Sequence, residues 1–212
     1  MRPQAPKYRP LWVLILSSVM LLAGGYALVS GLLKLRDPMV VLSVGITGPA
    51  GSDADVQLNS RLAAVRAATV SPHRSRVRTE AVVEIFLALF TLYATAAVLS
   101  RDRHGRALAL GVAALGIVYQ LGTLPVYLSL MHDYAERASD LLAEVVLQSA
   151  GGTSSLSAAE VARRLRSAMI GGPIVVALVG VAGSVVLFAF FGGRRGRALY
   201  GMDLPAAKKP GP

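Results

Sequence analysis

Apolar residues dominate four long stretches of this sequence, and polar and charged residues gather between them. The stretches cover residues 11–33, 81–99, 107–131 and 169–191. The first has 23 residues, which at about 1.5 Å per residue makes roughly 35 Å of helix, enough to cross a hydrocarbon core of about 30 Å. The pattern predicts an all-α membrane protein whose core is a four-transmembrane-helix bundle.

The first stretch has two interpretations. Twelve of its 23 residues are Leu, Ile or Val, and each favours insertion by roughly 0.3–0.6 kcal/mol at the helix centre. A secretory signal peptide would use Arg2, Lys7 and Arg9 as its basic region, but its apolar run is only about 7–15 residues long. We therefore interpret this stretch as an uncleaved signal anchor.

The first long loop, residues 34–80, is expected to hold an amphipathic helix. After a turn-rich stretch, residues 47–52, apolar or small side chains recur at helical spacing at Leu58, Leu62, Val65 and Thr69. Asp53 is placed to cap this helix and Pro72 to stop it. The helix either packs on the ends of the spans or offers a surface to lipid or a partner.

The second long loop, residues 132–168, is patterned more strongly. On a helix starting near His132, acidic residues recur every four positions on one face and apolar residues fill the opposite face. The first face holds His132, Glu136, Asp140 and Glu144, and the second holds Ala138, Leu141, Leu142 and Val145. The acidic face is either solvated or ion-paired, docks a basic partner, or lends His132 and Glu136 to one metal ion.

A helical hairpin should follow. Residues 151–155 predict a link, and the Ser157-x-x-Glu160 pattern predicts a second helix that begins near Ala158. Its apolar stripe should pack on the acidic helix, and its other face is basic. The stripe is Val161, Leu165 and Ala168, and the basic residues are Arg163, Arg164 and Arg166.

Composition supports a membrane protein, because 54% of the residues are hydrophobic and only 16% are charged. The net charge of +10 does not indicate nucleic-acid binding, since the basic residues flank the spans. Arg outnumbers Lys by 18 to 4, a ratio that we read as a sign of a GC-rich bacterial genome.

The distribution of positive charge predicts the orientation. Residues 1–10, 100–106 and 192–212 hold 11 Arg and Lys in 38 residues, whereas residues 34–79 and 132–168 hold 11 in 83. Basic residues resist translocation. We therefore expect a multi-pass protein of the cell inner membrane with both termini cytoplasmic, a disordered basic tail after residue 191 and extracytoplasmic long loops. Arg74, Arg76 and Arg78 are exceptions, because they precede the second span on the outer side.

Candidate chemistry is sparse. The absence of cysteine excludes disulfides, thiol chemistry and Cys-based metal sites. His73, His104 and His132 all fall in loops or at span ends, so no pair within the membrane could hold a haem. No phosphate-binding glycine loop or catalytic triad is found. We assign no catalytic residue, cofactor or metal ligand.

Three polar residues lie at membrane depth: Glu80, Glu84 and Gln120. They could belong to a proton or cation pathway with Tyr93, Tyr119 or Tyr127 as neighbours. In the structural alternative, which we favour, Glu84 reaches water or pairs with Arg76 or Arg78.

Small residues at a spacing of four predict close helix packing, either within the chain or in a homo-oligomer. They are Ala23, Ala27 and Gly31 in the first span and Gly180 and Ser184 in the fourth. Pro125 is expected to kink the third span.

One short motif resembles a known family. The stretch Ser30-Gly-Leu-Leu-Lys-Leu-Arg-Asp-Pro38 is similar to the Gly-x-x-Lys ending of the first helix in DoxX-like four-helix membrane proteins. Some members of that family are subunits of quinone-linked oxidoreductases. The long loops depart from the family pattern, so no functional residue is transferred.

Two functions therefore remain. The first is a non-enzymatic accessory, scaffold or assembly subunit that binds another membrane or periplasmic protein through its outer helices. Its candidate partner-binding residues are Arg74, Arg76, Arg78, Glu136, Asp140, Glu144, Arg163, Arg164 and Arg166. The second is a small transporter, channel or DoxX-like oxidoreductase subunit that uses Glu84 and Gln120.

Overall fold

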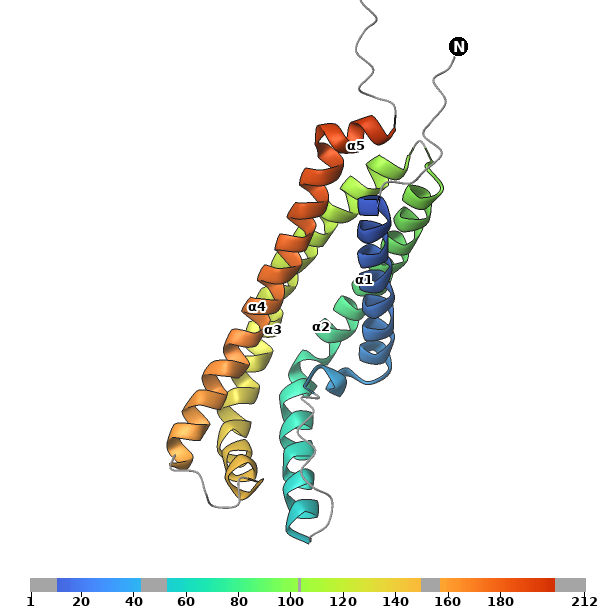
Figure 1. Ribbon diagram of the computed structural model, residues 1–212. Coiled ribbons are helices and arrows are strands. Elements are labelled where there is room, and N and C mark those ends of the chain that lie inside the picture. The colour runs from blue at the N-terminus through green and yellow to red at the C-terminus, as the bar shows by residue number, and fades with distance from the viewer. Residues whose placement is uncertain (1–10, 43–52, 103, 150–156, 201–212) are drawn as a thin grey trace, which may run out of the picture. The chain divides into compact units, whose positions relative to one another are not determined.

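The computed structural model describes residues 11–42, 53–102, 104–149 and 157–200. Every regular element in these ranges is helical (Figure 1). The elements are α1 (Leu11–Arg36), the 3-10 helix η1 (Pro38–Leu42), α2 (Asp53–Leu99), α3 (Gly105–Ser149), α4 (Ala158–Gly192) and α5 (Arg194–Leu199). Helices α1 to α4 are each long and apolar enough to cross a membrane, so the expectation of an all-helical protein with four candidate spans is confirmed.

The surfaces of these helices are suited to lipid. In the most apolar stretch of α4 only 11% of the residues are buried by the rest of the protein, and in α1 only 22%. Large side chains such as Leu22, Tyr26 and Val176 are mostly exposed. Soluble proteins seldom expose apolar surface on this scale. These helices indicate a multi-pass membrane protein.

The helices extend into the two segments that were expected to be long loops. Pro72 does not stop a helix, because α2 continues through it from Asp53 to Leu99. Proline removes one backbone hydrogen bond, but Val70 and Val77 on either side are buried in a hydrophobic core that holds both halves of the helix in place. Similarly, α3 does not restart near His132 but runs from Gly105 to Ser149.

The helix predicted to begin near Ala158 does begin there, and it continues directly into the fourth span as α4. The Ser157 Oγ accepts a hydrogen bond from the backbone N–H of Glu160 at 3.3 Å, as the cap predicts. The expected amphipathic helices are therefore ends of the long helices. The turn-rich stretch 47–52 and the link 151–155 lie outside the described residues.

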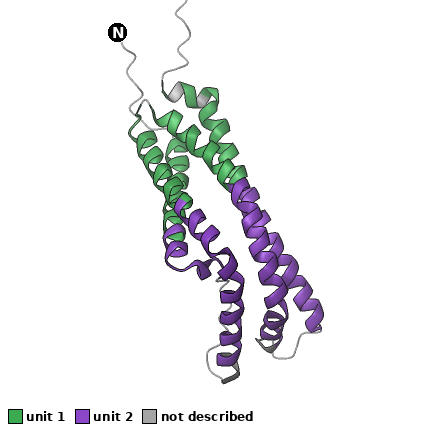
Figure 2. Ribbon diagram, turned by 180° about the vertical axis from the view of Figure 1, so that it is seen from behind, with its two compact units in different colours: residues 1–30, 83–119, 180–212 green, residues 31–82, 120–179 purple. Residues whose placement is uncertain are grey.

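The chain divides into two compact units (Figure 2). Unit 1 comprises residues 1–30, 83–119 and 180–212. Its core contains side chains from all four long helices, including Met20, Val98, Val112 and Phe191. The ring centroids of Trp12 and Phe190 lie 4.2 Å apart and extend this core.

Small residues allow two close approaches within unit 1. A Cβ on Gly24 would lie 3.1 Å from Leu92 Cδ2, so Gly24 lets α1 and α2 approach. A Cβ on Gly116 would lie 2.7 Å from Ser184 Oγ, which places Ser184 at a contact between α3 and α4. Of the other residues expected to pack, Gly31 is buried, Ala27 and Gly180 are half-buried, and Ala23 is exposed.

Unit 2 comprises residues 31–82 and 120–179. Its core joins Leu42 of η1, Leu62 of α2 and Leu142 of α3, and Met169 of α4 packs against it. The expected hairpin is present, because Ala143 of α3 packs against the N-terminal turns of α4. In that contact Val161 and Leu165 take part as predicted, whereas Ala168 is exposed.

The short helix α5 lies within the tail that the sequence led us to expect as disordered. In Figure 1 its axis turns away from that of α4. Its boundary with α4 falls at Gly193, whose N–H still donates to the Ala189 carbonyl oxygen at 3.0 Å.

A candidate polar site between three helices

Three polar residues of α2 are spaced by seven positions: Arg66, His73 and Glu80. Seven residues are nearly two helical turns, so the three side chains lie on one face. Buried Val70 and Val77 alternate with them along it. This part of α2 therefore presents a stripe in which polar and apolar residues alternate.

Each polar residue of the stripe contacts α3. His73 Nε2 lies 3.1 Å from Asp133 Oδ2, and Arg66 Nε lies 3.5 Å from the Tyr134 hydroxyl. Glu80 Oε1 accepts a hydrogen bond from the Tyr127 hydroxyl. Partner numbers on α3 fall as residue numbers on α2 rise, so the two helices run antiparallel here. We call these six residues the polar seam; all of them belong to unit 2.

A third helix joins the seam at Glu80. Lys34, in the last turn of α1, donates to the Tyr127 hydroxyl at 2.6 Å and lies 3.3 Å from Glu80 Oε1. Its Nζ also lies 5.3 Å from the centroid of the Tyr127 ring, within the range of a cation–π contact. Lys34, Glu80 and Tyr127 thus form a closed triangle of interactions, one residue from each of three helices.

The triangle is largely shielded from solvent, with Glu80 buried and Lys34 and Tyr127 half-buried. The side chain of Lys34 is 13% exposed and that of Glu80 is 6% exposed. Transferring both charges out of water costs several kcal/mol per ion, which mutual attraction and additional hydrogen bonds must offset. The Tyr127 hydroxyl helps by accepting from the ammonium and donating to the carboxylate.

The triangle lies at the ends of three of the expected spans. Lys34 directly follows residue 33, Glu80 directly precedes residue 81, and Tyr127 lies four residues before residue 131. These are the ends of the first three predicted spans that adjoin the two long predicted loops. A lysine in the last turn also interacts favourably with the negative end of its helix. Chemically, the arrangement can fix the register of three helices or exchange a proton between its members.

The other two intramembrane candidates, Glu84 and Gln120, differ in their burial. Glu84 is buried at 7% exposure, and Arg76 and Arg78 are exposed. Burial along α2 continues from Glu80 through Ala81 to Glu84. Gln120 is half-buried on α3.

The candidate partner-binding residues lie on the exterior of unit 2. All of them are exposed: Arg74, Arg76, Arg78, Glu136, Asp140, Glu144, Arg163, Arg164 and Arg166. On α3, His132 Nε2 lies 3.3 Å from Glu136 Oε1 in an exposed pair. Among the described residues no group of three His, Asp or Glu could hold a metal ion.

The basic side chains of α4 have local partners. Arg164 Nε donates to Glu160 Oε1 at 2.9 Å, and Arg163 pairs with the other carboxylate oxygen. The hydrogen bond from Arg164, followed by the nearby charges, lowers the pKa of Glu160, which lies before the fourth span. Arg166 Nη2 lies 3.4 Å from the hydroxyl of buried Ser139 on α3.

Sequence reasoning identified Glu80 and named Tyr127 as a possible neighbour, but it missed Lys34, His73 and Asp133 as members of the site. Lys34 drew attention only within a short family resemblance. The spacing of seven between polar residues of α2 was a signal that could have located the seam. Lys34 had no comparable signal, because it lies 46 residues from Glu80.

Comparisons of the chain with protein-family models, curated proteins and solved structures find no match. The functional interpretation therefore rests on the residues and their contacts.

Proposed function

We propose that this chain is a non-enzymatic subunit of a bacterial inner membrane that holds a partner protein on the outer side. In this role it serves as an accessory, scaffold or assembly factor. The partner-binding region is the part of unit 2 formed by residues 53–80, 132–149 and 158–168, which we call the outer arm.

The observation that carries this proposal is the packed continuation of three helices beyond the expected spans. Leu62, Tyr134 and Leu142 are buried in the core of the outer arm, so the arm is a folded unit rather than a set of loops. A folded element outside the bilayer can present a fixed surface to another protein, whereas it contributes nothing to crossing the membrane.

The acidic row of α3 is the most suitable contact surface. Glu136, Asp140 and Glu144 are exposed and recur every four residues, so their carboxylates line one side of the arm. Such charges steer and orient a basic partner more than they add affinity. The partner should therefore present Lys or Arg along a helix or strand of matching length.

Purification in mild detergent with quantitative mass spectrometry tests the proposal. We expect one partner to co-purify with the native chain and to be lost, by at least about tenfold, from the triple variant Glu136→Gln, Asp140→Asn, Glu144→Gln. The matched control exchanges Asp and Glu at the same three positions, keeps every charge and should retain the partner. A chain that is reproducibly recovered alone, or equal recovery with the neutral variant, would contradict the proposal.

A second candidate function is favoured by the triangle of Lys34, Glu80 and Tyr127. Ionisable residues buried at the end of a span are costly, and transporters and membrane oxidoreductases use such groups to pass protons. In this alternative Glu84 and Gln120 belong to a proton or cation route, and Glu80 of the triangle is a further candidate member. Proteoliposomes containing a pH-sensitive dye would show proton flux that Glu80→Gln abolishes, and flux no greater than in empty vesicles excludes the alternative.

A further inference from the structure

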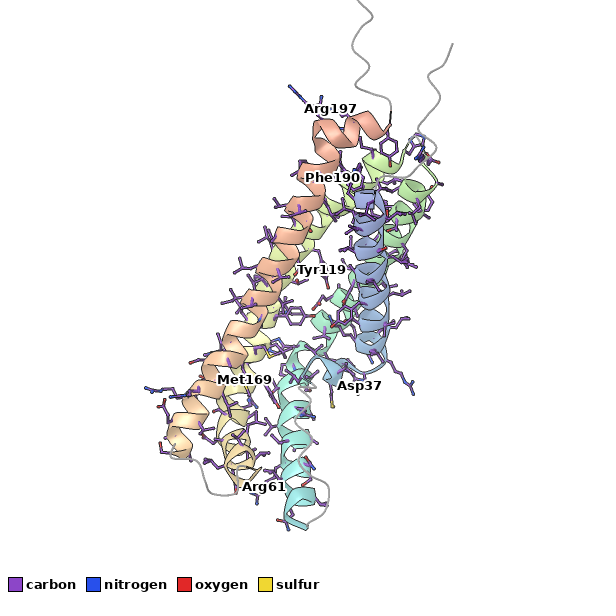
Figure 3. All side chains as sticks on the ribbon, in the orientation of Figure 1. Asp37, Arg61, Tyr119, Met169, Phe190 and Arg197 are labelled. Atoms are coloured by element: carbon purple, nitrogen blue, oxygen red, sulfur yellow. The ribbon has the colours of Figure 1, made fainter. Side chains whose placement is uncertain are left out.

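The end of unit 1 at the α4–α5 junction is strongly basic. The described residues 100–102, 104–106 and 192–200 together contain five Arg and one Asp. Arg194 and Arg197 of α5 are exposed, and Figure 3 labels Arg197 on that helix. Because both segments adjoin spans, these charges are expected at the level of lipid headgroups.

Glycine fixes the position of α5. A Cβ on Gly196 would lie 2.6 Å from the Phe191 carbonyl oxygen and 2.7 Å from its Cα, distances that no side chain tolerates. The helix therefore rests directly on the backbone at the end of α4. With Gly196 facing inward, the neighbouring Arg197 faces outward and is exposed.

Two contacts with the start of α3 hold this arrangement. Arg106 Nε donates to the Phe191 carbonyl oxygen at 2.8 Å, which satisfies an acceptor in the last turn of α4. Tyr200, directly after α5, packs so closely on Gly105 that a Cβ there would lie 2.7 Å from its hydroxyl oxygen. The start of α3 thus contacts both the last turn of α4 and the residue that follows α5.

Aromatic residues mark the same end of unit 1 as a boundary. Trp12, in the first turn of α1, packs on Phe190 near the end of α4, and Phe190 packs on Phe191. Tryptophan is enriched where a span meets the membrane–water interface. Two arginines on a helix at the expected membrane–water interface can bind phosphate groups at a lower entropic cost than arginines on a flexible segment.

We propose that Arg194 and Arg197 of α5 bind the phosphate headgroup of an anionic phospholipid. The guanidinium groups provide planar donors that match phosphate oxygens, and each is expected to strengthen binding to an anionic headgroup roughly fivefold. This inference is independent of partner binding by the outer arm, because α5 belongs to unit 1.

The test measures binding of fluorescent phosphatidylglycerol and phosphatidylcholine to the intact purified protein in neutral detergent. Arg194→Gln with Arg197→Gln should weaken phosphatidylglycerol binding by roughly 25-fold and leave phosphatidylcholine binding unchanged. Lysine at both positions keeps the charge and should restore most of the binding, which separates loss of charge from any disturbance of α5.

A control variant removes the same charge elsewhere. Arg61 and Arg137 are exposed in the outer arm, and replacing both by Gln should leave phosphatidylglycerol binding within about twofold of native. The proposal is overturned if this control loses as much binding as the α5 variant, if the native protein shows no preference for phosphatidylglycerol, or if millimolar inorganic phosphate at constant ionic strength displaces the lipid.

Discussion

Replacing Lys34 by Met should destabilise the protein strongly. The change keeps the length of the side chain but leaves the Glu80 carboxylate, only 6% exposed, without the ammonium 3.3 Å away. Removing one partner of a buried ion pair costs about 3–5 kcal/mol, because the remaining charge stays out of water. The Tyr127 hydroxyl still donates to Glu80, so we expect a loss near the lower limit, about 3 kcal/mol.

The double variant Lys34→Met, Glu80→Gln should recover most of this loss. Once Glu80 is neutral, its side chain no longer needs the missing ammonium, and neutral replacements of buried ion pairs are often tolerated. We expect the double variant to lie within about 1 kcal/mol of the native protein, so that adding Glu80→Gln to Lys34→Met recovers roughly 2 kcal/mol.

Far-UV circular dichroism during SDS titration in mixed micelles measures these differences. Arg36→Met is the control, because Arg36 lies in the same last turn of α1 but is exposed; it should change stability by no more than about 0.5 kcal/mol. The reasoning is refuted if Lys34→Met is as mild as this control, or if adding Glu80→Gln makes the protein less stable still.

Three further changes have defined outcomes. Pro72→Ala should raise stability by about 2 kcal/mol in the same titration, because the exposed ring removes a backbone hydrogen bond from α2 without filling a core. An unchanged or lower stability would contradict this reasoning. Gly105→Ala should destabilise the protein by about 1–3 kcal/mol, since its Cβ would lie 2.8 Å from a backbone oxygen of α2. The control Gly122→Ala in α3 should be neutral or slightly stabilising, because its Cβ would meet nothing within 4 Å. Equal effects of the two variants would contradict this packing. Carbon-detected NMR should find the pKa of Glu160 below its ordinary value, and Arg164→Ala should raise it. Because the folded pKa is the lower one, the stabilisation by this pair is complete above the ordinary pKa and is lost as pH falls through the folded value.

The spans and most helical segments could be predicted from the sequence because they depend on local periodicity. The apolar faces that include Leu62 and Leu142 were recognised in this way, and both are buried. The cap at Ser157 is equally local, and the helix starts where it predicts.

Helix continuity was not predictable, because it depends on contacts between distant residues. Proline at position 72 is a genuine local signal for an end, but burial of Val70 and Val77 outweighs the one lost hydrogen bond. The triangle of Lys34, Glu80 and Tyr127 could not be predicted for the same reason, since Tyr127 lies 93 residues from Lys34. The sequence shows that polar residues lie at the span ends, but it does not show which of them contact one another.

The contact between Trp12 and Phe190 has a practical consequence for spectroscopy. Trp12 is the single tryptophan of the chain, and it packs against the core of unit 1. Its fluorescence emission therefore reports the environment of unit 1 alone, whereas backbone circular dichroism averages over every helix. If the two signals change at different SDS concentrations, the units unfold separately; coincident transitions mean that the long helices make them a single cooperative structure.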